Sequence, residues 1–105
     1  MKEITVQELK AWKDSNKEFQ LIDVREAYEN EWNEIGGKLI PLSTVMDNLN
    51  LINRKGDVVI HCNSGARASA LIDILENKEG FTNLINLKGG IEAWGNEIDN
   101  SKLSY

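Results

Sequence analysis

The stretch DVVIHCNSGARASALIDILENK, residues 57–78, joins the clearest strand of the sequence to its clearest helix. Val58, Val59 and Ile60 are apolar and β-branched and follow a Lys-Gly-Asp turn signal, which predicts a buried strand over residues 57–62. Residues 66–78 repeat apolar side chains at helical spacing, and Gly80 is expected to end that helix. The strand ends with His61 and Cys62, the single histidine and single cysteine of the chain, and the turn follows them.

Working outward from this unit, strands and helices alternate along the whole sequence. Strand signals occur at 2–5, 19–24, 38–42 and 83–87, and helix signals at 6–16, 25–32, 45–52 and 89–98. Thr5 is the expected N-cap of the first helix, and Ser43 or Thr44 that of the third. Repeated strand–helix units in a short chain predict an α/β fold. We expect one domain over residues 1–105, with a parallel sheet of about five strands and helices on both faces.

Composition excludes several classes of function. The net charge is −5 and there is no basic block, so nucleic-acid binding is not expected. No apolar run approaches the ~20 residues that cross a bilayer. The N-terminal segment lacks the apolar stretch of a secretion signal, so a cytoplasmic location is expected. One cysteine and one histidine form neither an internal disulfide nor a zinc cluster, which leaves Cys62 as a packed apolar side chain or a reactive thiol.

The turn after Cys62 has the features of an anion-binding loop. Asn63, Ser64, Gly65 and Ala66 connect the strand to the helix, and Gly65 can adopt positive φ. Asn63 also tolerates that region better than most residues. A tight turn before a helix directs amide N–H groups at one point, and Arg67 adds a full positive charge. Such surroundings favour a thiolate, which is the nucleophilic form of cysteine.

Two further residues of this stretch have weaker functional signals. Adjacent strand residues point to opposite faces, so His61 is expected to serve the core rather than act on Cys62. Ser64 either bonds an attached sulfur or caps its own loop.

Four segments in order resemble the small rhodanese-like sulfurtransferases. They are HCNSGARA (61–68), LIDVRE (21–26), IPL (40–42) and LKGGIEAW (87–94). The resemblance implies that Cys62 takes a sulfane sulfur from a small donor such as thiosulfate, becomes a persulfide, and passes the sulfur to a thiol or protein thiol. It further implies that the amides of residues 63–67 form the cradle, that Arg67 orients the loop and attracts the anion, and that no metal or organic cofactor takes part.

Other matched residues are expected to support the loop. Asp23 and Arg25 are interpreted as a structural hydrogen-bonded pair near it. Gly89 and Gly90 are expected to let a turn approach another backbone closely, beside residues 63–67, here called the active loop. The segment NEIGGK, residues 33–38, departs from the family pattern because Glu34 stands where many members have histidine.

Two alternatives remain open at this stage. Cysteine phosphatases also combine a thiolate, inward amides and an arginine, but their loop between cysteine and arginine is one residue longer. Here four residues, 63–66, separate Cys62 from Arg67, and the narrower loop suits a single sulfur atom better than a phosphate group. The second alternative is a non-enzymatic sulfur carrier or binding module, which would share the persulfide but differ in its partner.

Overall fold

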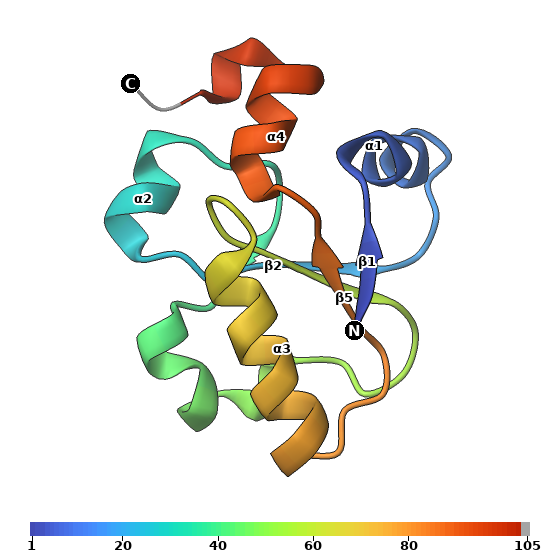
Figure 1. Cartoon of the computed structure of the whole chain (residues 1–105), viewed down its shortest axis with the longest axis vertical. Helices are drawn as coiled ribbons and strands as arrows, with labels where there is room; N and C mark the ends of the chain where they lie inside the picture. The colour runs from blue at the N-terminus through green and yellow to red at the C-terminus, as the bar shows by residue number, and fades with distance from the viewer. Residues whose placement is uncertain (104–105) are drawn as a thin grey trace.

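The computed structural model describes residues 1–103 and contains the five-stranded parallel sheet expected from the sequence (Figure 1). The strands lie in the order β1-β5-β4-β2-β3. Their bounds are β1 Lys2–Ile4, β2 Gln20–Asp23, β3 Lys38–Leu39, β4 Val58–His61 and β5 Leu84–Leu87. Every neighbouring pair is parallel, and in the central pairing Ile60 of β4 lies opposite Ile22 of β2 and Asn86 of β5.

Within residues 1–103, four α-helices connect and cover the strands. They are α1 Val6–Asp14, α2 Ala27–Trp32, α3 Ala66–Lys78 and α4 Gly90–Glu97. The predicted range of α3 is confirmed, and the other bounds differ from expectation by a few residues. Thr5 caps α1 as predicted, because its hydroxyl accepts a hydrogen bond from the Glu8 amide while the Glu8 carboxylate accepts one from the Thr5 amide.

The prediction of a helix over residues 45–52 is wrong. The segment forms two short 3-10 helices, η1 Leu42–Asp47 and η2 Leu49–Leu51, and a third, η3 Asn100–Lys102, follows α4. Neither Ser43 nor Thr44 caps a helix there, since Pro41 occupies the capping position and the Thr44 hydroxyl bonds to the Pro41 carbonyl. Helix-weak residues such as Asn48, together with the extended backbone at Pro41, favour tight local turns over a continuous α-helix.

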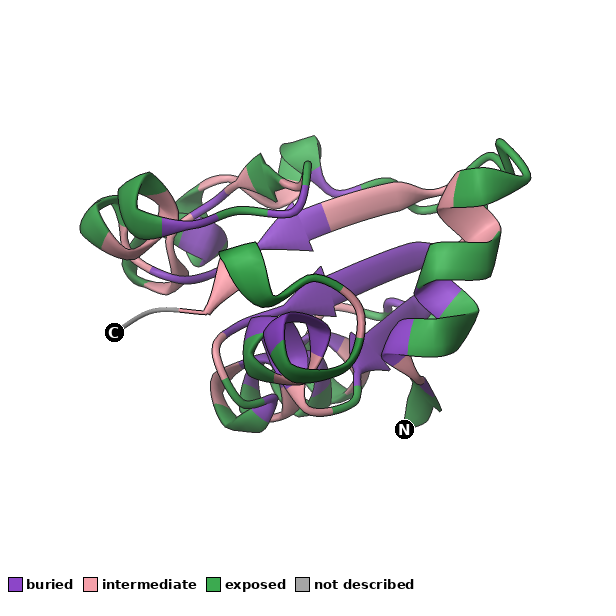
Figure 2. Ribbon diagram, turned by 90° about the horizontal axis from the view of Figure 1, so that it is seen from above, coloured by how far each residue is buried: buried purple, intermediate pink, exposed green. Residues whose placement is uncertain are grey.

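The helices cover both faces of the sheet, as predicted. Val58 and Ile60 of β4 pack with Leu71 and Leu75 of α3 in one apolar cluster. Val59 points the other way and packs with residues of α1 and α4 in a second cluster. Strands β4 and β5 are buried along their whole length and are purple in Figure 2, whereas the outer sides of the helices are green. Because β4 is central, its carboxyl end opens at the middle of one sheet edge, where α/β folds place their ligands.

The helices themselves are short. Over residues 1–103, none is both long and apolar enough to cross a membrane.

Candidate active site

The loop between β4 and α3 depends on a single left-handed residue. Gly65 has φ of +103° and forms the N-cap of α3. Asn63 does not adopt a positive φ, since Asn16 is the one non-glycine residue in the described chain that does. Gly65 therefore makes the turn alone, and an L side chain there would be strained.

The turn brings backbone amides to the sulfur of Cys62. The N–H groups of Gly65 and Ala68 donate to Sγ over 3.1 and 3.5 Å. Ala68 lies one position beyond the cradle expected from the sequence, since it is the first turn of α3 that curls its amide back over the strand end. Of the other loop residues, Asn63 is half-buried, whereas Ser64 and Ala66 are exposed. The arrangement stabilises negative charge on the sulfur.

Cys62 is also part of the core. The residue is 1% exposed and belongs to the same apolar cluster as Ala68 and Leu71. Its sulfur thus has apolar packing on one side and peptide dipoles on the other. The environment combines the two readings of this cysteine that the sequence left open.

Arg67 differs most from its expected position. Its guanidinium donates to both carboxylate oxygens of Glu29 in α2, over 2.7 and 2.8 Å. These bonds lower the pKa of Glu29 and raise that of Arg67. The charge expected to attract an anion is therefore already neutralised, and the paired side chains tie α2 to the first turn of α3. Sequence patterns did not identify Glu29, because it lies 38 positions before Arg67.

The glycine pair at the start of α4 lies against the loop. Gly90 has φ of +60°, and a Cβ added to it would lie 2.5 Å from the Cys62 carbonyl oxygen and closer still to that of Asn63. The close approach lets the amides of Ile91 and Glu92 donate to those two carbonyls, each over 3.0 Å. Gly89 precedes it as the left-handed N-cap. The close approach expected at this glycine pair is therefore present at Gly90, which meets the loop after Cys62, whereas a Cβ added to Gly89 would meet only Ala93 of its own helix.

A second support comes from Asn86 in β5, which the sequence analysis missed. Its side-chain amide lies 3.4 Å from the carbonyl of Gly65. The sequence offered one indication of this role, because Asn86 is a polar residue within the apolar run LINL, residues 84–87. It is buried in the structure, and a buried polar side chain needs a hydrogen-bond partner.

Asp23 and Arg25 form a buried pair, as interpreted from the sequence. The Arg25 guanidinium donates to Asp23 over 2.8 Å and to both the side-chain and backbone oxygens of Asn33 over 2.7 Å. Burial raises the pKa of Asp23, but the bonds from Arg25, together with the contributions of His61 and Asn30, hold that pKa below its ordinary value. The Asn33 amide in turn donates to the Lys102 carbonyl, so the network anchors η3 near the α2–β3 connection.

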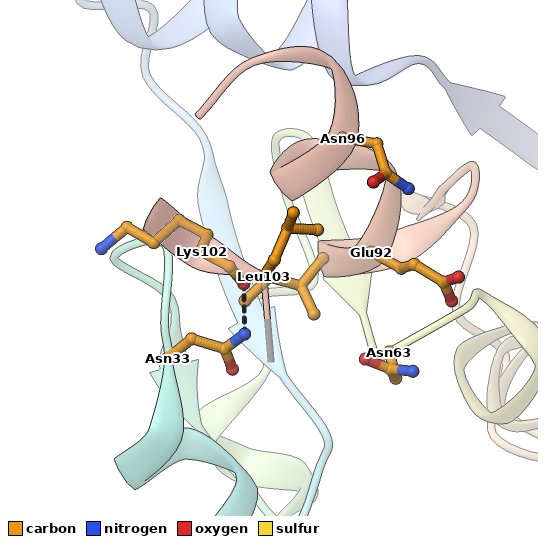
Figure 3. Close-up of a pocket in the computed structure, with 7 residues that line it drawn as sticks. Asn33, Asn63, Glu92, Asn96, Lys102 and Leu103 are labelled. Atoms are coloured by element: carbon orange, nitrogen blue, oxygen red, sulfur yellow. Dashed lines mark hydrogen bonds between the residues drawn. The ribbon is translucent and has the colours of Figure 1, made fainter. Parts of the chain in front are cut away.

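A polar pocket of about 370 Å³ adjoins the loop on the α4 side (Figure 3). Asn63 and Glu92 lie at one side of it, and Asn33, bonded to Lys102, lies at the other. The pocket thus connects the active loop to the Arg25 network.

His61 lies on the opposite face of the strand from Cys62 and is fully buried. Burial lowers its pKa to about 4, against the opposing charge of Asp23. Its Nε2 has no hydrogen-bond partner among the described residues, and a Cβ added at Gly37 would lie 3.4 Å from it. The neutral imidazole therefore fills the second face of the sheet, as expected for a structural histidine.

Comparison with known families agrees with this architecture. The model of the rhodanese-like domain matches residues 5–97. The chain belongs to the rhodanese-like domain family. Its structure superposes on that of a rhodanese-like domain protein from Staphylococcus aureus with a TM-score of 0.83 and 37% identity, covering 93% of this chain and 95% of that one.

Sequence relatives of this rhodanese-like domain differ in length. The uncharacterized protein YqhL of Bacillus subtilis is 37% identical over 103 residues, covering 97% of this chain and 79% of YqhL. The probable adenylyltransferase/sulfurtransferase MoeZ of Mycobacterium tuberculosis is 33% identical over 107 residues, covering 97% of this chain. The chain spans only 26% of MoeZ, so it matches one part of that larger protein.

Proposed function

We propose that this rhodanese-like domain is a sulfurtransferase that works through a persulfide on Cys62. The observation that carries the proposal is the pair of amides, from Gly65 and Ala68, that donate to the sulfur of the only cysteine. A structural cysteine needs no such donors, whereas a sulfur that becomes an anion does. The likeness to MoeZ, whose name includes a sulfurtransferase, is consistent with this chemistry.

The reaction needs only this loop and two substrates. The Cys62 thiolate attacks the sulfane sulfur of a donor such as thiosulfate, a new S–S bond forms, and the donor's S–S bond breaks to release sulfite. The amides that stabilised the thiolate then stabilise the persulfide anion. A small thiol, a protein thiol or cyanide attacks the outer sulfur, takes it away and returns the Cys62 thiolate. Neither a metal nor an organic cofactor is required by this scheme.

Arg67 is proposed as a positioning residue. Its bidentate pair with Glu29 holds the first turn of α3, which carries the Ala68 amide. The same pairing weighs against the phosphatase alternative, because a phosphate-binding arginine has to offer its two donors to the substrate.

Intact-protein mass spectrometry tests the proposal. After incubation with thiosulfate, we expect a gain of one sulfur atom that cyanide removes again. Cys62→Ser should show no gain, and neither should protein alkylated at Cys62 beforehand. Unchanged mass in the wild-type protein would refute the proposal, and cleavage of an aryl phosphate by that protein would support the phosphatase alternative.

A further inference from the structure

Two large aromatic side chains face solvent on α2. Tyr28 and Trp32 are 57% and 67% exposed, the highest exposed fractions among the large apolar residues of the described chain. Their ring centroids lie 5.3 Å apart in an edge-to-face arrangement, which restricts both side chains. Exposed tyrosine and tryptophan side chains held in this way are typical of protein interfaces, because they bury a large area at a low cost in side-chain entropy.

The aromatic pair lies beside the active loop. Glu29, between the two aromatic residues in sequence, accepts both hydrogen bonds of the Arg67 guanidinium, and α2 lies next to the start of α3 in Figure 1. Glu29 raises the pKa of Arg67 most, and the nearby Cys62 and Tyr28 raise that pKa further, against the effect of burial. Tyr28 and the Cys62 sulfur are therefore both within electrostatic reach of one guanidinium, so a partner seated on α2 would lie beside the loop.

The surroundings of the pair are acidic. Residues 26–34 contain four glutamates and neither lysine nor arginine. Glu29 is held by its ion pair, but neither Glu26 nor Glu31 takes part in an ion pair within residues 1–103. Glu31 is exposed and lies three positions after Tyr28, so both side chains lie on one side of the helix. Ring faces and carboxylates together attract a cationic side chain.

The same charge disfavours other occupants of this surface. A second copy of the chain would bring its own acidic α2 and a net charge of −5. Nucleic acids and anionic lipid surfaces are repelled for the same reason. A protein segment with arginine or lysine side chains is the occupant that fits both the aromatic rings and the carboxylates.

We propose that Tyr28 and Trp32 form a docking surface for a basic segment of the protein whose thiol accepts sulfur from Cys62. The proposal rests on the sulfurtransferase function and specifies where the acceptor binds and which charge it carries. The acceptor's thiolate attacks the outer sulfur of the persulfide and forms a new S–S bond with it. The S–S bond on the protein breaks, and its electron pair returns to Cys62 as the thiolate.

The test compares two thiol peptides as acceptors for protein that carries the Cys62 persulfide. The basic peptide is Ac-Arg-Gly-Cys-Gly-Arg-NH₂, and the neutral peptide is Ac-Gln-Gly-Cys-Gly-Gln-NH₂. Mass spectrometry follows the loss of the outer sulfur, and the intrinsic reactivities of the two thiols cancel when the ratio of rate constants is compared between variants. We expect Trp32→Leu to lower the basic-to-neutral ratio about two- to fivefold, the size of an exposed cation–π contact. Trp32→Tyr keeps an aromatic ring and should retain most of the ratio.

A second pair of variants tests the carboxylates. Glu31→Gln should lower the ratio about twofold, because it removes one negative charge beside the rings, and the effect should disappear in high salt. Glu18→Gln is the matched control, since Glu18 is also exposed but precedes β2 and lies at the opposite edge of the sheet from the active loop. Its ratio should equal that of the wild-type protein.

The outcomes separate the docking surface from the sulfurtransferase function. The same ratio in wild type and Trp32→Leu would overturn the proposal and leave the function intact. Equal losses in Glu18→Gln and Glu31→Gln would also overturn it, because net charge alone would then steer the peptide. A dimer that Trp32→Leu dissociates, seen by analytical ultracentrifugation, would assign the surface to a second copy instead. No persulfide with any donor would refute the function itself, and this proposal with it.

Discussion

Replacing Gly90 by alanine should destabilise the junction between α4 and the active loop. The new Cβ would lie 2.5 Å from the Cys62 carbonyl oxygen and would also meet the Asn63 carbonyl. Real Cβ atoms do not approach backbone oxygens so closely, so the start of α4 must move away. That movement weakens the bonds from the Ile91 and Glu92 amides to the two carbonyls, which are now each 3.0 Å long.

The magnitude follows from two contributions. Holding an L residue at φ of +60° costs about 1–2 kcal/mol. Weakening two buried backbone hydrogen bonds costs about 1 kcal/mol each. We therefore expect Gly90→Ala to lower the free energy of unfolding by about 3–4 kcal/mol, measured by urea denaturation. The persulfide should also form more slowly, because the displaced carbonyls belong to Cys62 and the residue after it.

Gly56→Ala is a suitable control for the backbone contribution. Gly56 also has positive φ, +78°, but nothing lies within 4 Å of a Cβ added there. Gly56→Ala should therefore lower the free energy of unfolding by the conformational contribution alone, about 1–2 kcal/mol. Equal losses of stability in Gly56→Ala and Gly90→Ala would refute the inference that α4 is packed against the loop at Gly90.

Two further predictions concern charged groups. His61 stays neutral in the folded protein down to a pKa of about 4, whereas in the unfolded chain it is protonated below about 6.5. The unfolded state thus binds more protons in this window, so the free energy of unfolding should fall by about 3 kcal/mol between pH 6.5 and 4. His61 is the only histidine, so its imidazole can be titrated by NMR. A midpoint near pH 6.5 would contradict this prediction. For Glu29 and Arg67, a double-mutant cycle with glutamine at each position should give a coupling of about 1 kcal/mol that weakens in high salt. A coupling of zero would mean that the pair does not hold α2 to α3.

Much of the fold follows from local signals. The alternation of apolar strands and helices predicted the parallel sheet, and residues 66–78 form α3 as expected. These signals act over a few residues, because strand burial, helix periodicity and glycine turns are properties of neighbours in the chain. The segment 45–52 is the exception, since its apolar spacing favoured a helix while Pro41 and Asn48 favour 3-10 turns.

The sequence also determined where the candidate nucleophile lies. One cysteine, followed by a turn with Gly65 and then a helix, was sufficient to place a sulfur at a strand end beside a helix N-terminus. Resemblance to the rhodanese-like family then supplied the chemistry. Neither the placement of the cysteine nor the resemblance to the family depends on contacts between distant residues.

The tertiary structure alone decided which distant groups support the loop that carries that sulfur. It paired Arg67 with Glu29 rather than leaving it free and brought Asn86 to Gly65. The reason is that the order β1-β5-β4-β2-β3 sets β4 between strands that lie far from it in the chain. Contacts across those strands and their helices depend on packing in three dimensions, which short-range sequence patterns do not encode.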